Sequence, residues 1–319
     1  MRMRSLLTAL TAFAAVAIAL SAMPAAAKVA GPNGRIVFSR YDPAADDNFT
    51  YTANPDGSNP QPLFPTFHSG FAHWSPDGTE VAVTSGLDSP CCIGHTVIIN
   101  PDTGDYRVVT PETPSGGGTF CSIWSPDASH FACEGGSDND PSLNGVYTVR
   151  SSDGGGLTRI TNAGGASDIP IDYSPDGTQI VFARSINHDC SGKSALYVVS
   201  VDGTGLHRIT PWGFCDDDGS WSPDGTKIAF ASGKLLGRIY VVHPDGAGLM
   251  QLPIPVSSES GLADVSWSPD GTKIAFSLGT RAGGEGIYTA NANGTDLRRA
   301  TSSPTFDHQV DWGPHALVP

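Results

Sequence analysis

The side chains that could do chemistry are spread along this sequence in no common catalytic pattern. Its nine histidines include no His-x-x-x-His pair, the spacing that places two metal ligands on one face of a helix. The sequence also holds no Gly-x-Ser-x-Gly nucleophile motif and no Gly-x-x-x-x-Gly-Lys-Ser/Thr phosphate loop. A metal or catalytic cluster of His and Asp side chains that the fold brings together is the alternative to consider.

The carboxylates are mostly Asp rather than Glu, and the chain is rich in residues that favour turns. Gly and Pro number 38 and 25 among 319 residues, and only 16% of the chain is charged. Asp suits turns and caps whereas Glu suits helices, so this balance argues against a helical bundle or a coiled coil. The 39% of apolar residues can form a sizeable core, and the net charge of −14 disfavours unspecific binding to nucleic acid or anionic membranes.

An internal repeat indicates which elements position these side chains. Copies of the string Trp-Ser-Pro-Asp-Gly-Thr, some of them altered, begin at Trp74, Trp124, Tyr173, Trp221, Trp267 and Trp312. The Asp residues of the first five copies, at positions 77, 127, 176, 224 and 270, are interpreted as turn formers rather than as an array of functional carboxylates. Gly can take a positive φ in such a turn, so Ala128, which replaces it in the second copy, is expected to strain the turn or change its type.

Each repeat of 45 to 50 residues contains four short apolar or β-branched runs, which we name strands A to D. Strand B, for example Ile228-Ala229-Phe230, is apolar on both faces, as a sheet packed between two others requires. The sequence thus predicts an all-β, six-bladed β-propeller of four-stranded antiparallel blades, forming a single domain over residues 28–319. The strand ending at Trp312 is expected to join the N-terminal blade and close the ring.

The string Trp-Ser-Pro-Asp-Gly-Thr-Lys-Ile-Ala-Phe is complete at residues 221–230 and 267–276. It resembles the TolB-type (WD40-like, PD40) propeller repeat, and the resemblance extends over roughly residues 31–314. It implies an extracytoplasmic protein whose propeller serves as a binding surface. TolB itself has an additional α/β domain before its propeller, so the resemblance is to a stand-alone propeller.

Charge is predicted to gather on one face of the ring. The B–C and D–A loops share this face and carry sixteen acidic residues against five basic ones, whereas the A–B and C–D turns share the other face. The loops are interpreted either as a solubilising surface or as a face that binds a cation or a basic partner. The candidate ligand- or partner-binding residues are Asp168, Trp212, Asp216, Asp217, Asp218, Asp264, Asp307 and His308.

Three groups of residues are expected at or near the channel or a ligand. Asp216–Asp218 are expected at the mouth of the channel, and Trp212 could stack on a ligand. His73, Asp172 and Asp311 each precede the aromatic residue of an innermost strand, so they should approach the channel either as packing groups or as a metal or catalytic cluster.

All six cysteines lie after the N-terminal apolar segment, and in an oxidising compartment disulfides are expected. Cys190 and Cys215 fall in loops on the same face of neighbouring blades, which predicts a Cys190–Cys215 bond. Two more bonds are expected among Cys91, Cys92, Cys121 and Cys133, with Cys92–Cys121 the preferred pairing for one. Metal binding is the alternative, but the Cys-x-x-Cys spacing of zinc sites is missing.

Residues 1–27 have the layout of a secretory signal peptide. Arg2 and Arg4 precede an apolar run from Leu6 to Leu20, and Ala25-Ala26-Ala27 form a small-residue cleavage site. A retained membrane anchor is the alternative, although the run is shorter than the ~20 residues of a span. The mature chain is expected to be periplasmic or secreted, without a transmembrane segment, and monomeric.

These observations predict a non-catalytic binding or scaffold protein. It would recognise a protein or a cell-envelope component, and no nucleic acid, through its acidic B–C and D–A loops. No cofactor and no metal site are expected, with a divalent cation on the acidic loops as the variant to test. The alternative function is an extracytoplasmic metal-assisted lyase or hydrolase acting at the channel mouth, for instance on saccharides.

Overall fold

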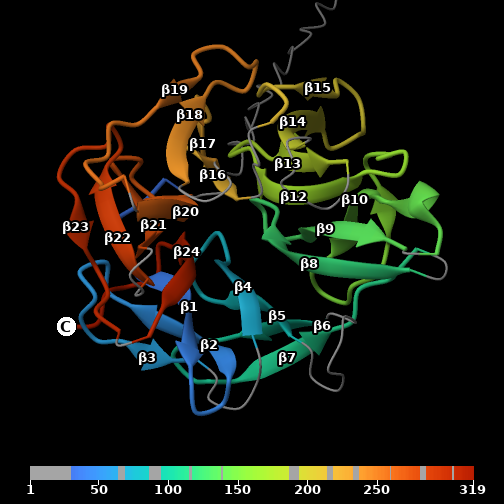
Figure 1. Cartoon of the computed structure of the whole chain (residues 1–319). Coiled ribbons are helices and arrows are strands. Elements are labelled where there is room, and N and C mark those ends of the chain that lie inside the picture. The colour runs from blue at the N-terminus through green and yellow to red at the C-terminus, as the bar shows by residue number, and fades with distance from the viewer. Residues whose placement is uncertain are drawn as a thin grey trace, which may run out of the picture.

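The computed structural model describes residues 30–63, 69–85, 95–114, 117–137, 139–186, 194–213, 218–232, 237–258, 260–280, 285–303 and 305–319. These residues form a ring of six four-stranded antiparallel sheets, seen along its axis in Figure 1. The helical structure within them is a short 3-10 turn, η1 (Pro141–Leu143). The predicted all-β, six-bladed propeller is confirmed, whereas the predicted signal peptide, residues 1–27, lies outside the described residues.

Blades 2 to 6 are each built from four strands that are consecutive in the chain, with the first strand innermost at the channel and the fourth outermost. They are β4 (Ser69–Trp74), β5 (Val81–Ser85), β6 (His95–Ile99) and β7 (Tyr106–Val109); β8 (Gly118–Trp124), β9 (His130–Gly136), β10 (Gly145–Arg150) and β11 (Thr158–Arg159); β12 (Ser167–Tyr173), β13 (Gln179–Ser185), β14 (Ser194–Ser200) and β15 (His207–Arg208); β16 (Gly219–Trp221), β17 (Ile228–Ser232), β18 (Arg238–Val242) and β19 (Met250–Gln251); and β20 (Ser260–Trp267), β21 (Lys273–Thr280), β22 (Glu285–Asn291) and β23 (Arg298–Arg299).

Blade 1 combines the two ends of the described chain. It contains β1 (Ile36–Asp42), β2 (Asp47–Ala53), β3 (Gln61–Pro62) and, as its innermost strand, β24 (Asp307–Trp312). β24 pairs antiparallel with β1, so that Trp312 lies opposite Ile36, and Figure 1 shows the red strand beside the blue one. The indole N–H of Trp312 also donates to the Gly34 carbonyl at 2.9 Å. The predicted ring closure is confirmed, because β24 covers the edge of β1 that would otherwise lack a strand partner.

The hydrophobic core lies between adjacent blades. The second strand of each blade is buried on both faces, as with Ile180, Val181 and Phe182, whose side chains are all inaccessible to solvent. Residues of neighbouring blades share one cluster, for example Val146 of blade 3 with Tyr173 of blade 4. The six aromatic residues that begin the repeated motif are buried between the blades, where they act as wedges.

The A–B turns are centred on one carboxylate. In the turn at Asp224, Oδ1 accepts hydrogen bonds from Ser222 Oγ at 2.7 Å and from the backbone N and Oγ1 of Thr226 at 3.0 and 2.8 Å. Burial by itself would raise the pKa of Asp224, but these hydrogen bonds outweigh it and lower the pKa. The equivalent Asp residues of the other four turns make the same bonds, so their predicted role as turn formers is confirmed.

Ala128 keeps the turn type of the other four copies. Its N–H donates to the Ser125 carbonyl at 2.8 Å, as the N–H of Gly225 does to Ser222. Ala128 has a φ of 56°, a left-handed conformation that costs an L-residue about 1 to 2 kcal/mol. Of the two outcomes expected for this position, the structure shows a strained turn.

Candidate functional site

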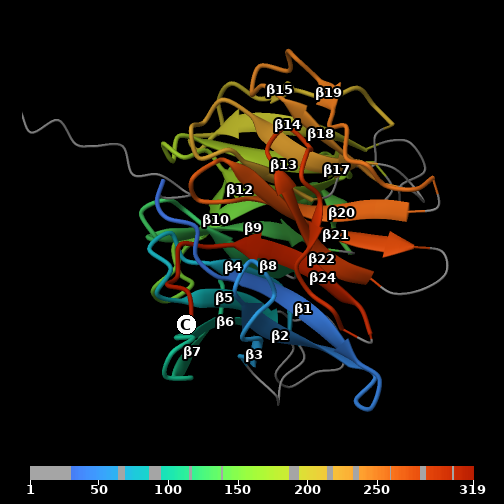
Figure 2. The same cartoon turned by 90° about the vertical axis from the view of Figure 1, so that its left-hand side faces the viewer.

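The two faces of the propeller differ in what they expose. Figure 2 shows the ring from the side, with the C-terminus on one face and the end of β21 directed toward the opposite face. This opposite face carries the B–C and D–A connections, and we call it the loop face. A cavity of about 300 Å³ opens at the loop-face end of the channel. Its volume is at the low end of the range for ligand pockets in proteins.

The loop-face cavity is lined by the innermost strands near their first residues and by the ends of two second strands. Apolar side chains such as Ile169 and Pro170 form most of its wall. The polar and aromatic residues of its lining include Phe71, Phe120, Glu134, Asp218, Asp264 and Gln309.

A backbone irregularity in three blades orients residues toward this cavity. Phe71, Asp264 and Gln309 each lie three positions before the aromatic residue of their strand, and their φ values are 50°, 52° and 55°. At each of these positions the register between the first and second strands of the blade shifts by one residue. Such bulges re-aim side chains, and non-glycine residues in this conformation occur often at functional sites.

The same three residues are joined across blades 6, 1 and 2. Asp264 Oδ2 accepts from the backbone N of Gln309 at 2.9 Å and from Ser277 Oγ at 2.6 Å. The side-chain carbonyl of Gln309 accepts from the backbone N of Phe71 at 3.2 Å. The wall of the cavity is therefore held in place by hydrogen bonds between blades, not only by packing.

Two phenylalanines at this cavity are unusually exposed for a folded protein. The side chain of Phe71 is 53% exposed and that of Phe120 is 42% exposed, although both line the cavity. Large apolar side chains exposed beside a concave surface are typical of binding sites.

Glu134 is a carboxyl group of the cavity with a raised pKa. It lies on β9 opposite Phe120 of β8 and is half-buried. Burial raises its pKa to about 7, and the Asp168 carboxylate contributes in the same direction. Glu134 therefore changes charge close to neutral pH.

Hydrogen bonds between blades occupy the carboxylates at the other end of the channel. His73, Asp172 and Asp311 line a smaller space of about 60 Å³ there, as their positions in the repeat predicted. Asp172 Oδ2 accepts from the backbone N of Trp221 at 2.8 Å, and Asp311 Oδ2 accepts from that of Trp74 at 3.0 Å. Among the residues that the structure describes, no group of three or more His, Cys, Asp or Glu side chains is arranged to hold a metal ion.

Two of the candidate acidic residues lie inside blades. Asp168 and Asp307 have no exposed surface and each forms a two-pronged ion pair with an arginine. Arg184 Nε and Nη2 contact Asp168 at 2.6 and 2.7 Å, and Arg40 contacts Asp307 at 2.7 and 2.9 Å. Each guanidinium also lies over the rings of a Phe and a Tyr of its own blade. This arrangement stabilises blades 1 and 4 and neutralises part of the negative charge of the loops.

The other candidate residues are divided between the cavity and the outer surface. Asp218 and Asp264 line the cavity. His308 Nε2 is 2.9 Å from Asn48 Oδ1 within blade 1. Trp212 is 39% exposed, packs edge-on against Tyr197 and is covered by the Arg208 guanidinium. The remaining candidates, Asp216 and Asp217, lie outside the described residues.

Phe71, Phe120 and Gln309 were not among the residues singled out from the sequence, and Glu134 was counted only as one of the sixteen acidic residues of the B–C and D–A loops. Phe120 lies four positions before its motif aromatic residue, and Phe71 and Gln309 lie three positions before theirs. A search of these two positions in every repeat, rather than of the loops alone, would have found them. Glu134 has no such signal, because its burial depends on the neighbouring blade.

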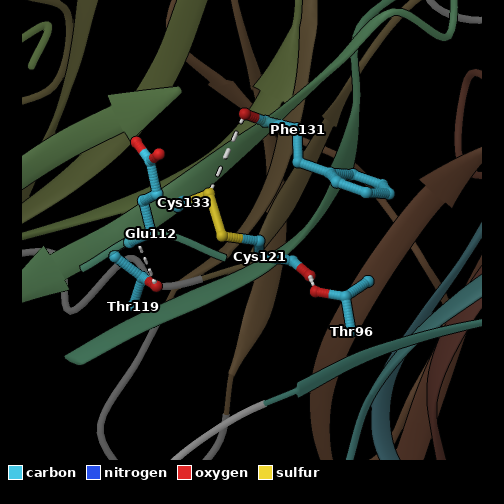
Figure 3. The surroundings of a disulfide bond; sticks show 6 residues. All are labelled: Thr96, Glu112, Thr119, Cys121, Phe131 and Cys133. Carbon is cyan, nitrogen blue, oxygen red and sulfur yellow. Dashed lines mark hydrogen bonds between the residues drawn. A yellow bond between two sulfur atoms is a disulfide. The ribbon is translucent and has the colours of Figure 1, made fainter. Parts of the chain in front are cut away.

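One disulfide lies beside the cavity. Cys121 and Cys133 are bonded across β8 and β9, where they face each other directly in the register of the two strands (Figure 3). The expected Cys92–Cys121 pairing is therefore wrong, because the fold places Cys121 opposite a residue of its own hairpin, with a Cα–Cα distance of 4.2 Å. The four remaining cysteines, Cys91, Cys92, Cys190 and Cys215, lie outside the described residues, so the Cys190–Cys215 bond stays a prediction.

Comparison with known proteins agrees with this architecture. Residues 32–252 match the family model of the TolB beta propeller domain. A curated relative, the uncharacterized protein Atu1656 of Agrobacterium fabrum (strain C58 / ATCC 33970), is 34% identical over 162 residues. The match covers 50% of this chain and 49% of the relative, so the chain spans about half the length of that protein.

Solved structures share the fold at low sequence identity. TolB from Acinetobacter baumannii superposes with a TM-score of 0.70 at 20% identity, covering 88% of this chain and 66% of that one. A putative TolB from Agrobacterium tumefaciens gives a TM-score of 0.64 at 17% identity, covering 87% and 90%. An oligogalacturonate lyase in complex with manganese gives 0.57 at 16% identity, covering 85% and 74%. Within the described residues, no helix has the length and apolar character that a membrane span requires.

Proposed function

This chain belongs to the TolB beta propeller domain family, and on that premise we propose that it is a non-catalytic binding protein. It holds a protein or a cell-envelope component on its loop face. The observation that carries this proposal is the loop-face cavity, with Phe71 and Phe120 exposed at its wall. Aromatic side chains in a preformed recess are frequent anchors of protein interfaces.

The way the ring is built also supports a binding role. Six blades packed through their cores form a rigid frame, and the bonds from Asp264 to Gln309 and from Gln309 to Phe71 hold the cavity wall across three blades. A preformed site loses less conformational entropy when a partner binds. Asp172 and Asp311, which line the space at the other end of the channel, accept hydrogen bonds from backbone N–H groups, an arrangement that supports the fold rather than a reaction.

We further propose that the protein acts outside the cytoplasm. The Cys121–Cys133 bond is of the kind that persists in oxidising compartments, and the N-terminal segment has the charge and hydropathy pattern of a signal peptide. Detection of the processed chain in the periplasm or medium, with Lys28 as the first residue, is the direct test. A full-length chain that remains in the cytoplasm would contradict the location.

Site-specific crosslinking tests the binding face. A photoreactive phenylalanine analogue replaces Phe71 or Phe120 in the full chain, produced in the cells that naturally make it. The matched control carries the analogue at Val201, which is 37% exposed on a C–D turn of the opposite face. We expect discrete crosslinked adducts from the two loop-face positions and none from Val201. Adducts from Val201 alone would place the binding face on the other side of the ring.

A further inference from the structure

We infer that the loop-face cavity takes a lysine or arginine side chain, flanked by apolar residues, from an extended segment of a protein partner. This inference rests on the proposed binding function and specifies the chemistry of the partner. It combines the charge, the wall composition and the position of the cavity, and each of these excludes a different class of ligand.

The charge of the cavity favours a cation. Glu134, Asp218 and Asp264 contribute carboxyl groups to its lining, whereas no lysine or arginine is among its lining residues in the described part of the chain. Arg40 and Arg184, on the second strands of blades 1 and 4, have their guanidinium groups engaged with buried carboxylates. A recess with carboxylates and low-dielectric walls concentrates a negative potential, which attracts cations and repels acidic segments.

The wall composition favours a cation carried on an apolar stem. Ile169 and Pro170 offer apolar surface along which the methylene groups of Lys or Arg can lie. Phe71 and Phe120 expose their rings beside the same space, and ring faces attract ammonium and guanidinium groups. A hydrated metal ion would gain nothing from this apolar wall, whereas a basic side chain uses both parts of the site.

The carboxylate of Asp264 is held in position before any ligand arrives. Its Oδ2 accepts from Ser277 and from the backbone N of Gln309, which restricts the rotation of the carboxyl group. A charged acceptor fixed in this way does not lose side-chain entropy when a cation binds. The Asp264 carboxylate is thus already oriented as an acceptor before a cationic donor binds.

The position of the cavity favours an extended segment as the source of the cation. The cavity is recessed among the innermost strands and has a volume of about 300 Å³, which suits one long side chain and its neighbours. A flat folded surface does not reach into such a recess, whereas an extended chain can insert one side chain and lie across the exposed Phe71 and Phe120.

A fixed-position peptide library tests this inference whichever protein the partner is. Pools of randomised pentapeptides carry arginine, lysine, citrulline, leucine or glutamate at the central position and are captured on the immobilised full chain at pH 8. Citrulline has nearly the shape of arginine but no charge. We expect the arginine and lysine pools to be retained roughly tenfold more than the citrulline pool, as for a charge-assisted contact.

Two variants show whether the selectivity belongs to the cavity. Glu134→Gln removes a cavity carboxylate while keeping its shape, and it should reduce the preference for arginine over citrulline to about threefold or less. Asp202→Asn removes a carboxylate from a C–D turn on the opposite face and should leave the preference unchanged.

The remaining outcomes decide between this inference and the proposed function. Equal retention of the arginine and citrulline pools, or preference for the glutamate pool, overturns the inference. So does competition by free arginine amide that is as effective as competition by the selected peptides, because the source would then be a small amine. If crosslinks at Phe71 and Phe120 persist while no basic preference is found, the binding function stands and only its specified chemistry fails.

Discussion

Asp311 and Trp74 lie 237 positions apart in the chain, yet the Asp311 carboxylate accepts a hydrogen bond from the backbone N–H of Trp74 at 3.0 Å. The bond connects the last strand of the chain, in blade 1, to the first strand of blade 2 beside the channel. Asp172 makes the same bond to Trp221 between blades 4 and 5. In blades 1 and 4 the residue that precedes the motif aromatic residue therefore links one blade to the next.

Replacement of Asp311 by Ala should destabilise the ring. The Asp311 carboxylate is buried, accepts from Trp74 and also accepts from Ser266 Oγ at 2.8 Å, and its loss leaves a buried N–H without an acceptor. We expect the free energy of unfolding to fall by about 2 to 3 kcal/mol in chemical denaturation. The control Asp105→Ala, at an exposed turn position, should change it by less than about 0.5 kcal/mol.

The strained turn at Ala128 predicts a stabilising substitution. Ala128→Gly relieves the left-handed conformation at φ 56° and should raise the free energy of unfolding by about 1 kcal/mol. The reverse change, Gly225→Ala at φ 74° in the equivalent turn, should lower it by a similar amount, because the added Cβ meets its nearest neighbour, Pro175, only at 3.9 Å. A loss of stability in Ala128→Gly would show that the Ala128 methyl contributes packing that outweighs the strain.

The raised pKa of Glu134 predicts that the folded chain loses stability as the pH rises. Its pKa is raised in the folded chain from 4.5 to about 7, so between these values the folded chain binds more protons than the unfolded chain. The free energy of unfolding should therefore fall between about pH 4.5 and pH 7 and then level off, with at most about 3 kcal/mol arising from Glu134. Denaturation curves of the wild-type chain and of Glu134→Gln across this range measure the effect.

The difference between those two proteins isolates Glu134 from its ionisable surroundings. Asp168, paired with Arg184, lies close to it, and His73, Asp218 and Asp264 line the same cavity. These groups are present in both proteins, so the part of their titration that does not depend on the charge of Glu134 cancels when the two curves are subtracted. A pH-independent difference would contradict the raised pKa.

The Cys121–Cys133 bond should contribute to stability although it closes a short loop. The two cysteines are separated by 12 positions, for which the loss of chain entropy in the unfolded state corresponds to about 3 kcal/mol. The double replacement Cys121→Ala and Cys133→Ala should lower the free energy of unfolding by about 2 to 4 kcal/mol. Peptide mapping under non-reducing conditions should also recover Cys121 and Cys133 in one crosslinked fragment, and a fragment linking Cys121 to Cys92 would contradict the structure.

The fold of this protein follows from the sequence because it depends on local and periodic information. The conformation of the Ser-Pro-Asp-Gly turns, for example at Asp224 and Gly225, depends on nearby residues alone. The number of motif copies and their regular spacing indicate the number of blades. The position of Trp312 relative to the first apolar run was enough to predict the ring closure. The turn-rich, Asp-rich composition is therefore mostly a consequence of the propeller.

The candidate site depends on relations that no periodic pattern contains. A backbone bulge orients Phe71 and Gln309 toward the cavity, and a neighbouring blade buries Glu134. Asp168 is buried in an ion pair with Arg184 and so does not add to the exposed charge of the acidic loops. The sequence places charges on a face but does not reveal which of them already have a buried partner. Exposure, ion pairing and pKa depend on distances between blades, so only the tertiary structure decided which carboxyl groups remain at the cavity to meet a ligand.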